Sequence, residues 1–264
     1  MGMSPLRRLV SQAGLVDNQY KNPSTARCSG FSDMKAARPK APTTPNPPSP
    51  PGARRRKPAQ SRARATADAI RDAFFQLLAE KPYDRISIRQ VIGLAGVGIG
   101  SFYEYFSCKD ALAAVCIHLR VKAIAATMRT SIDTHRTEPL PARVDALIDA
   151  QSAAPLAEPE HWAALFVVER KVSGIEAFRN MYAEFVQLWI ETLSGGPEWP
   201  TDAPLAPTAF AIHAMTYSLV SQTLMTATRP VDAVALRRAV GNAVHGYLSI
   251  QAPLAYRMHR FEPG

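Results

Sequence analysis

The chain has 264 residues, of which 47% are hydrophobic and 20% charged, and its formal net charge is +9. This length allows one large domain or two small ones, with enough apolar residues for a sizeable core. The charge is uneven: residues 1–64 hold 13 Lys/Arg against 2 Asp/Glu, whereas the rest holds 18 against 20. The three cysteines (Cys28, Cys108 and Cys116) match no zinc or disulfide spacing, which argues against a metal-binding or cross-linked fold and fits a cytoplasmic protein.

Residues 1–60 are predicted to form a disordered arm. Eight prolines lie between Pro39 and Pro58 with few large apolar residues, so this segment cannot form a core. No signal peptide is expected, because the first residues lack a long apolar run. A basic cluster closes the arm and could lie along DNA phosphates or enter a minor groove; the alternatives are a solvated tail or, for residues 1–50, a translation start placed too early. The cluster consists of Arg54, Arg55, Arg56, Lys57, Arg62 and Arg64.

The first helix is expected to start after Ser61 and to end near Glu80, with Ile70, Phe74 and Leu77 on one apolar stripe. Lys81-Pro82-Tyr83 follows it. Proline cannot adopt the left-handed conformation that often ends a helix, so this helix must end in another way.

Residues 86–112 hold two short helices joined by a turn. Ser87 and Gln90 have the spacing of a capping box, and Gly96 can take the positive φ of a helix end. The second helix should run from about 98 to 106, with Phe102 and Phe106 facing inward. Two short helices around a glycine turn are typical of a helix-turn-helix, in which the second helix reads the major groove. Ser107 is expected to cap the following helix.

The run from Arg64 to Leu112, about fifty residues, closely resembles the DNA-binding region of the tetracycline-repressor (TetR) family of bacterial regulators. The resemblance lies in the apolar first helix, Tyr83, the string SIRQV and the string AGVGIGSFYEYF followed by Lys109. Two positions depart from the family pattern. Pro82 replaces its usual glycine, and Gly98 replaces its usual Ser or Thr.

The resemblance and helix geometry together assign candidate DNA contacts. The hydroxyls of Ser87, Tyr103 and Tyr105 and the guanidinium of Arg89 would meet phosphates. Arg89 could also reach a guanine, and Ile99 could touch a thymine methyl. Tyr103 and Lys109 match the family's usual phosphate contacts, while Glu104 is either a cytosine acceptor or a solvent-facing residue. The candidates are Ser87, Arg89, Gly98, Ile99, Gly100, Ser101, Tyr103, Tyr105 and Lys109.

From residue 109 onward the chain is predicted to form amphipathic helices separated by Pro and Gly breakers. Their expected ranges are about 109–130, 142–153, 159–171, 174–194, 206–227 and 232–251. The fold is therefore all-α. Its expected parts are the arm (1–60), a helix-turn-helix domain (61–108) and a helical ligand-binding and dimerisation domain (109–264).

For this last domain the resemblance implies a small-molecule pocket, and each apolar candidate could equally be plain core. The candidates are Trp162, Phe166, Phe178, Tyr182, Trp189, Met128 and Met215, with His118 and His213 as possible polar anchors. The last two helices would pair with a second copy, and the uncharged residues Ile212, Met215, Leu219, Val220 and Leu224 are the expected dimer face.

The sequence therefore predicts a homodimeric, ligand-responsive repressor that binds a palindromic operator in double-stranded DNA. No enzyme motif, metal site or cofactor is expected, and no membrane span, because the uncharged stretch 203–228 contains two prolines and many polar residues. The alternatives are a ligand-independent DNA-binding or architectural protein, and a small-ligand-binding helical protein without a regulatory role.

Overall fold

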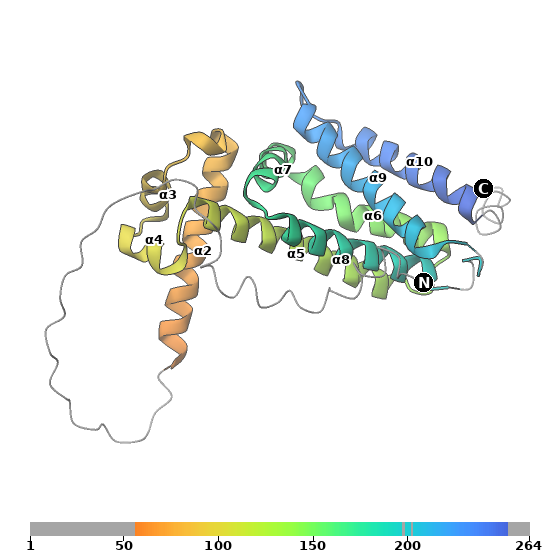
Figure 1. The fold of residues 1–264 in the computed structure, drawn as a ribbon, viewed down its shortest axis with the longest axis horizontal. Helices are drawn as coiled ribbons and strands as arrows, with labels where there is room; N and C mark the ends of the chain where they lie inside the picture. Colours follow the sequence, from red (N-terminus) through yellow and green to blue (C-terminus); the bar gives the residue numbers. More distant parts are fainter. Residues whose placement is uncertain (1–55, 197–198, 202, 253–264) are drawn as a thin grey trace, which may run out of the picture.

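The computed structural model describes residues 56–196, 199–201 and 203–252, with side chains from residue 62 onward, and this part of the chain is helical without any strand (Figure 1). The predicted all-α class is confirmed. The elements are α2 (Arg56–Glu80), η3 (Tyr83–Arg85), α3 (Ile88–Ala95), α4 (Ile99–Tyr105), α5 (Lys109–Thr134), α6 (Leu140–Ala157), α7 (Pro159–Val172), α8 (Ile175–Ser194), α9 (Leu205–Thr226) and α10 (Ala233–Gln251).

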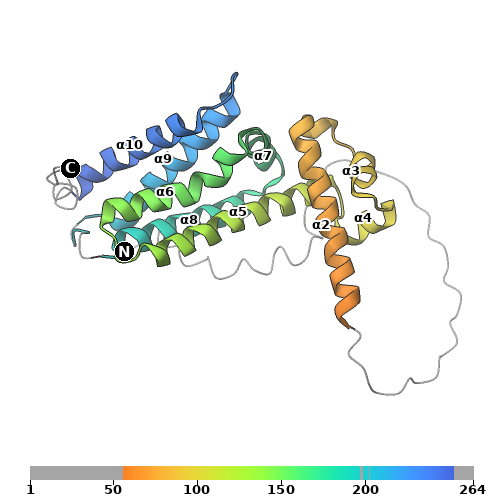
Figure 2. The same cartoon turned by 180° about the vertical axis from the view of Figure 1, so that it is seen from behind.

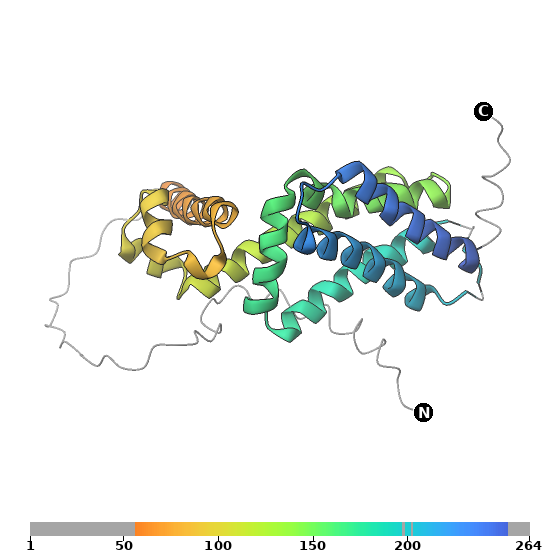
Figure 3. The ribbon, with the colours of Figure 1, turned by 90° about the horizontal axis from the view of Figure 1, so that it is seen from above.

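The helices form two lobes. Helices α2, α3 and α4 make up a small N-terminal lobe, and α5 leads from it into a bundle formed with α6 to α10 (Figures 2 and 3). Within the bundle α8 packs on α9, α5 on α6, and α10 on α9. The buried apolar side chains form one cluster that runs from Ile70 in α2 to Leu248 in α10. The two lobes therefore share a continuous core.

Helix α2 begins at Arg56, whereas the sequence predicted a start after Ser61. Pro58 does not prevent this, because a proline in the first helical turn lacks an N–H that would have no intrahelical partner in any case. Arg62 and Arg64 are exposed on this helix, and its N-terminal half extends past α4 (Figure 1). The prediction of disorder for residues 1–60 is wrong for residues 56–60, which are helical. Residues 1–55, which include Arg54 and Arg55, lie outside the described residues, as do the side chains of Arg56 and Lys57.

A short 3-10 turn replaces the glycine cap that is usual after the first helix. The Lys81 N–H donates to the Leu77 carbonyl at 3.1 Å, and Pro82 is extended with ψ 141°. Tyr83 then lies buried with its ring edge-on to Phe74, the ring centroids 6.1 Å apart. The missing glycine thus changes the turn without displacing the tyrosine that anchors it.

Helix α6 continues through Pro155, which the sequence placed in a breaker between two helices. The proline lies in the last turn, so it removes one backbone hydrogen bond and leaves the rest of the helix intact. Its ring is buried. A single residue, Glu158, separates α6 from α7.

The residues expected to form the dimer face largely point into the bundle. Ile212 is fully buried within the chain, and Val220 and Leu224 are nearly so. Core residues are uncharged as well, so lack of charge at these positions could not distinguish a core from a dimer face. The exposed apolar residues near this edge are Phe210 on α9 and Val234 and Ile250 on α10.

Helix α5 is the one described helix whose length and apolar composition match those of a membrane span. Core helices of globular proteins have the same composition. Leu112, Ile124 and Met128 of α5 are buried against the rest of the chain. This helix is therefore part of the core.

Candidate nucleic-acid interface and its cavity

Helix α3 starts and ends as the sequence predicts. The Gln90 N–H donates to Ser87 Oγ at 3.3 Å, and the Ser87 N–H donates to Gln90 Oε1 at 3.0 Å, which completes the capping box. Gly96 at the other end has φ 67°, a left-handed conformation that glycine adopts without strain. The turn to α4 is thus fixed by side-chain and backbone features that are local in sequence.

Helix α4 buries one face and exposes the other. Phe102 is fully buried and Phe106 nearly so, as predicted. On the opposite face Ile99 is 48% and Tyr103 56% exposed, which is high for large apolar and aromatic side chains. This exposure is expected of residues that a partner covers.

Two glycines, Gly98 and Gly100, flank Ile99. A Cβ added to Gly98 or Gly100 would meet no other atom within 4 Å, so internal packing does not require glycine at either position. Ser101 and Tyr105 are half-buried, and Tyr105 packs partly against the core. Of the candidate DNA-contact residues on α4 and its N-cap, the most exposed are therefore Gly98, Ile99, Gly100 and Tyr103. Ser87 and Arg89 are exposed at the start of α3.

Lys109 is held inside the N-terminal lobe. Its ammonium donates to the Tyr83 carbonyl at 3.0 Å and to the Ile86 carbonyl at 2.9 Å, and it lies 4.2 Å from the centre of the Tyr83 ring. Partial burial lowers the pKa of this lysine. Lys109 thus secures the turn that precedes α3, with one N–H left for another partner.

The same cluster orients the start of α5. The Tyr83 hydroxyl donates to the Asp110 carboxylate, and burial together with this bond raises the pKa of Tyr83. The N-cap of α5 is Cys108, whose side chain makes no capping hydrogen bond. The expectation that Ser107 caps this helix is wrong, because the helix starts one residue further along than a Ser107 cap requires.

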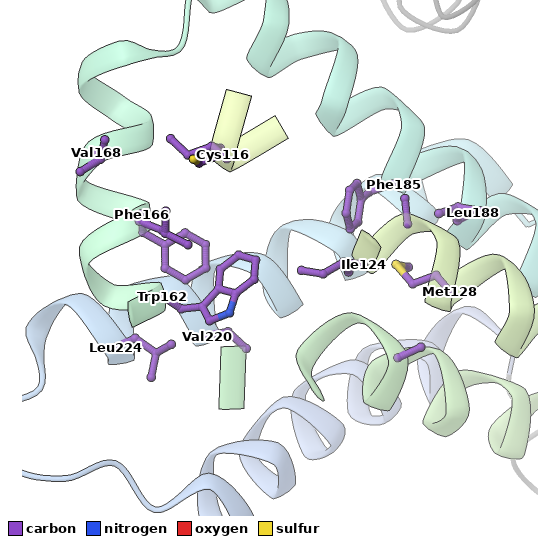
Figure 4. Close-up of a cluster of buried hydrophobic side chains, with 14 of the residues drawn as sticks. Cys116, Ile124, Met128, Trp162, Phe166, Val168, Phe185, Leu188, Val220 and Leu224 are labelled. Carbon is purple, nitrogen blue, oxygen red and sulfur yellow. The ribbon is translucent and has the colours of Figure 1, made fainter. Parts of the chain in front are cut away.

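A cavity lies in the bundle between α5, α6, α7, α8 and α9. Its side chains leave about 50 Å³ that a water-sized molecule can occupy, within a looser space of about 640 Å³ that is partly continuous with solvent. Trp162 and Phe166 of α7 face Val220 of α9 at one end, and Ile124 and Phe185 lie beyond them (Figure 4). An apolar cavity with a few polar groups is the usual form of a small-molecule site.

The polar groups of this cavity are buried and mostly paired. The Tyr217 hydroxyl donates to Glu169 Oε2 at 3.0 Å, and the Trp189 indole N–H donates to Gln151 Oε1 at 2.8 Å. Gln151 Nε2 lies 3.3 Å from His213 Nδ1. Burial lowers the pKa of His213 to about 3, so the imidazole is neutral at pH 7.

The predicted pocket residues occupy different places. Trp162 and Phe166 line this cavity, and Phe178 lines an adjoining outer cavity between α5 and α8. Tyr182 contacts the rings of His213 and Tyr217. The remaining three pack elsewhere: Trp189 and Met128 are fully buried and Met215 is half-buried, and none of them lines either cavity.

Sequence reasoning missed the two residues that give the cavity its chemistry, Glu169 and Tyr217. Glu169 lies seven residues after Trp162 and three after Phe166, on the same stripe of α7. A carboxylate that interrupts an aromatic stripe at helical spacing was the available signal. Tyr217 lies four residues after His213 and carried no comparable signal.

Helix α7 contacts the N-terminal lobe with its other side. The His161 ring stacks on Phe75 of α2, the centroids 4.4 Å apart, and Lys171 pairs with Asp84 of η3. The Arg120 guanidinium covers the same Phe75 ring at 3.1 Å from its centre and bonds Glu158 at 3.3 Å. The helix that lines the cavity thus also touches the N-terminal lobe.

This arrangement, a helix-turn-helix lobe on a helical bundle with an internal cavity, defines a class of DNA-binding transcription regulators. Residues 70–116 match the family model of bacterial regulatory proteins of the tetR family. This match confirms the resemblance carried by the sequence motifs, over the helix-turn-helix region that those motifs occupy. No curated protein sequence matches the chain.

Solved structures share the fold at low sequence identity. The fatty acid degradation regulator FadR from Bacillus halodurans is 18% identical with a TM-score of 0.57, covering 68% of this chain and 97% of its own. FadR from Bacillus subtilis, in complex with stearoyl-CoA, is 17% identical with a TM-score of 0.55, covering 67% and 96%. The TetR family regulator PfmR from Thermus thermophilus is 14% identical with a TM-score of 0.51, covering 69% and 96%.

Proposed function

We propose that the chain is a homodimeric repressor that binds a palindromic operator and releases it when a small molecule enters the bundle. The observation that carries this proposal is the exposed face of α4. Ile99 and Tyr103 are exposed there, and no internal contact requires the glycines on either side of Ile99. Because glycine has no side chain, the backbone at these two positions can approach DNA closely.

The proposed contacts divide by chemistry. Tyr103, Ser87 and Arg89 hold phosphates, and Ile99 touches a thymine methyl in the major groove. Ser101 and Tyr105, being half-buried, make shorter-range contacts at the edge of the same surface. Lys109 acts mainly by holding the turn before α3, with its third N–H directed to a phosphate.

Electrostatic attraction comes mainly from outside α3 and α4. Residues 65–112 hold 5 Lys/Arg against 6 Asp/Glu, so this region is not basic. Arg62 and Arg64 on the extended half of α2, with the basic residues before them, supply the positive charge that draws the chain to DNA.

We assign the dimer contact to the exposed sides of α9 and α10, on the outer edge of the bundle (Figure 1). Val234 and Ile250 are 69% and 75% exposed, and Phe210 of α9 is also exposed. Between them α10 exposes small residues, among them Ala239 and Gly246, which allow two helices to approach closely. A two-fold dimer would place the two α4 helices on equivalent half-sites.

Release follows from the two-sided contacts of α7. A molecule that enters the cavity displaces Trp162 and Phe166, and α7 carries this movement to Phe75 and Asp84 in the N-terminal lobe. The ligand shifts the equilibrium only if it prefers the form that does not fit the operator. The stearoyl-CoA in the FadR neighbour supports a small-molecule effector for this fold.

The test is selection of DNA sequences from a random duplex pool by the full chain. The proposal predicts enrichment of a short palindrome that binds two copies of the chain. Recovery of unrelated sequences, all bound with equal affinity, would show a non-selective DNA-binding protein instead.

A further inference from the structure

A carboxyl group lies inside the aromatic cavity. Glu169 on α7 is only 4% exposed, and its one hydrogen bond to a described side chain comes from the Tyr217 hydroxyl. Burial raises its pKa, and the Tyr217 bond and nearby Arg170 oppose this. A buried carboxylate without an opposite charge is costly and is usually paired.

No cation within the described residues forms an ion pair with this carboxyl. Arg120 also lines the cavity, but its guanidinium is paired with Glu158 and covered by the Phe75 ring. Arg170 donates to the Phe166 carbonyl at 2.9 Å and contacts the Met225 sulfur at 3.5 Å. His213 is neutral at pH 7 because burial lowers its pKa to about 3. The cavity is therefore short of positive charge.

Three aromatic rings lie close to the Tyr217 ring, whose hydroxyl bonds Glu169. The Phe166 ring meets the Tyr217 ring edge to face, the centroids 5.8 Å apart, and Phe178 and Tyr182 lie 6.3 and 6.4 Å from it. Ring faces attract cations through their quadrupole. A carboxylate among such rings is a common way in which proteins bind organic ammonium groups.

Glu169 also marks the junction of two cavities. It lines both the inner cavity and the outer one, a hollow of about 480 Å³ between α5 and α8 that is open to solvent. The two basic side chains at the outer cavity, Lys122 and Arg129, both pair with Glu184. Because Glu184 offsets the charges of Lys122 and Arg129, these two residues would not repel a cation on its way to the Glu169 carboxyl.

The lining of the inner cavity also contains a buried hydrogen-bond donor without an acceptor among the described residues. The Trp162 indole N–H is buried in the cavity lining and bonds no acceptor among the described residues. A buried donor left unpaired costs free energy, and a ligand oxygen could accept from it.

We propose that the effector is a lipophilic cation, with an apolar body in the inner cavity and an ammonium group on Glu169. This rests on the proposed function, because it names the chemistry of the ligand that the repressor would sense. The same charges disfavour a fatty acid or another acyl anion, whose carboxylate would lie beside Glu169.

The test compares three probes that share one alkyl chain: decylammonium, decanol and decanoate, below their micellar concentrations, at pH 7. Binding to the full chain without DNA is measured by calorimetry. We expect decylammonium to bind about tenfold or more tightly than decanoate, the ratio that a difference of about 1.4 kcal/mol produces. The wild-type comparison alone decides between cation and anion.

A pair of variants links the preference to the carboxyl. Glu169→Gln should lose about tenfold in affinity for decylammonium while keeping its affinity for decanol. Glu176→Gln, which removes the same charge from an exposed site on α8, should change neither. Thermal melting of both variants checks that they fold.

Equal or tighter binding of decanoate or decanol, or an unchanged Glu169→Gln variant, would overturn the cation assignment and leave the cavity as an effector site. Failure of all three probes to bind would overturn it together with the effector half of the proposed function. Operator selection, which needs no ligand, tests the DNA-binding half separately.

Discussion

The two lobes carry function in opposite ways. The N-terminal lobe presents its chemistry on the surface, where Ile99 and Tyr103 stand exposed on α4. The candidate ligand-binding residues of the bundle are internal. Glu169 is buried and bonds Tyr217, whose ring contacts the Phe166 ring. A surface that reads DNA depends on a few exposed side chains held by local caps, whereas an internal cavity depends on packing between helices distant in sequence. Mutations should therefore separate the lobes: surface changes affect DNA binding, and interior changes affect stability or ligand response.

The largest effect is expected from Trp189→Ala in the bundle core. Trp189 is fully buried and bonds Gln151, so its truncation should lower the free energy of unfolding by about 3–5 kcal/mol. Urea unfolding followed by circular dichroism measures this. Val167→Ala, at an exposed position on α7 outside the proposed dimer contact, is the matched control and should change stability by less than about 0.5 kcal/mol. Similar losses in both variants would mean that Trp189 does not belong to a packed core.

Tyr103→Ala should affect DNA binding without affecting the fold. Loss of a hydrogen bond to a charged phosphate costs about 1.5–3 kcal/mol, which corresponds to a weakening of operator binding of about tenfold to a hundredfold. Fluorescence anisotropy on the selected operator measures it. Tyr103→Phe separates the hydroxyl from the ring, since both variants should weaken binding if the hydroxyl makes the contact. Wild-type affinity in Tyr103→Ala would remove Tyr103 from the interface.

His213→Gln should change the pH dependence of stability. As pH falls from about 6.5, the unfolded chain takes up a proton at His213, whereas the folded chain does not until about 3. Because the unfolded state binds more protons in this window, His213 lowers the stability of the fold by about 1.4 kcal/mol per pH unit as pH decreases. The variant should lose that part of the slope in urea titrations between pH 6 and 4. An unchanged slope would indicate a histidine that titrates normally.

Several features could be predicted from the sequence because they are local. The capping box of Ser87 and Gln90, the left-handed Gly96 and the inward Phe102 each follow from spacing within one helical turn, and all three are present. The helices of the bundle also lie close to their predicted ranges, because amphipathic spacing and Pro or Gly breakers determine them.

Other features depend on contacts that spacing does not encode. Val220 and Leu224 are core residues, although an uncharged helix face had suggested a dimer contact. Lys109 binds the carbonyls of Tyr83 and Ile86, more than twenty residues earlier, which no local pattern indicates. Glu169 and Tyr217 likewise lie on different helices, and 48 positions separate them in the sequence.

Deletion of residues 1–55 should reduce the salt dependence of DNA binding while leaving α2 intact. Each phosphate contact that is lost lowers the slope of log K against log salt by about 0.9. Operator and random duplexes titrated between low and moderate salt measure this slope, and the preferred sequence should stay the same. An unaltered slope would show that the basic residues before Arg56 do not contact DNA.

The smallest effect is expected from Lys171→Ala at the contact between the lobes. Lys171 and Asp84 are both largely exposed, so the loss of their ion pair should leave stability nearly unchanged. Ligand-induced release of the operator should nevertheless become weaker, because α7 loses one of its contacts with the N-terminal lobe. Arg179→Ala, which breaks an exposed ion pair with Glu176 on α8, is the control and should keep the full response.

The coupling of the two lobes is tested most directly by one titration. The affinity of the full chain for its selected operator is measured by anisotropy with and without a saturating ligand of the inner cavity. If ligand binding releases the operator, we expect the ligand to weaken operator binding by about tenfold or more. An identical affinity in both conditions, with the ligand shown to be bound, would contradict it.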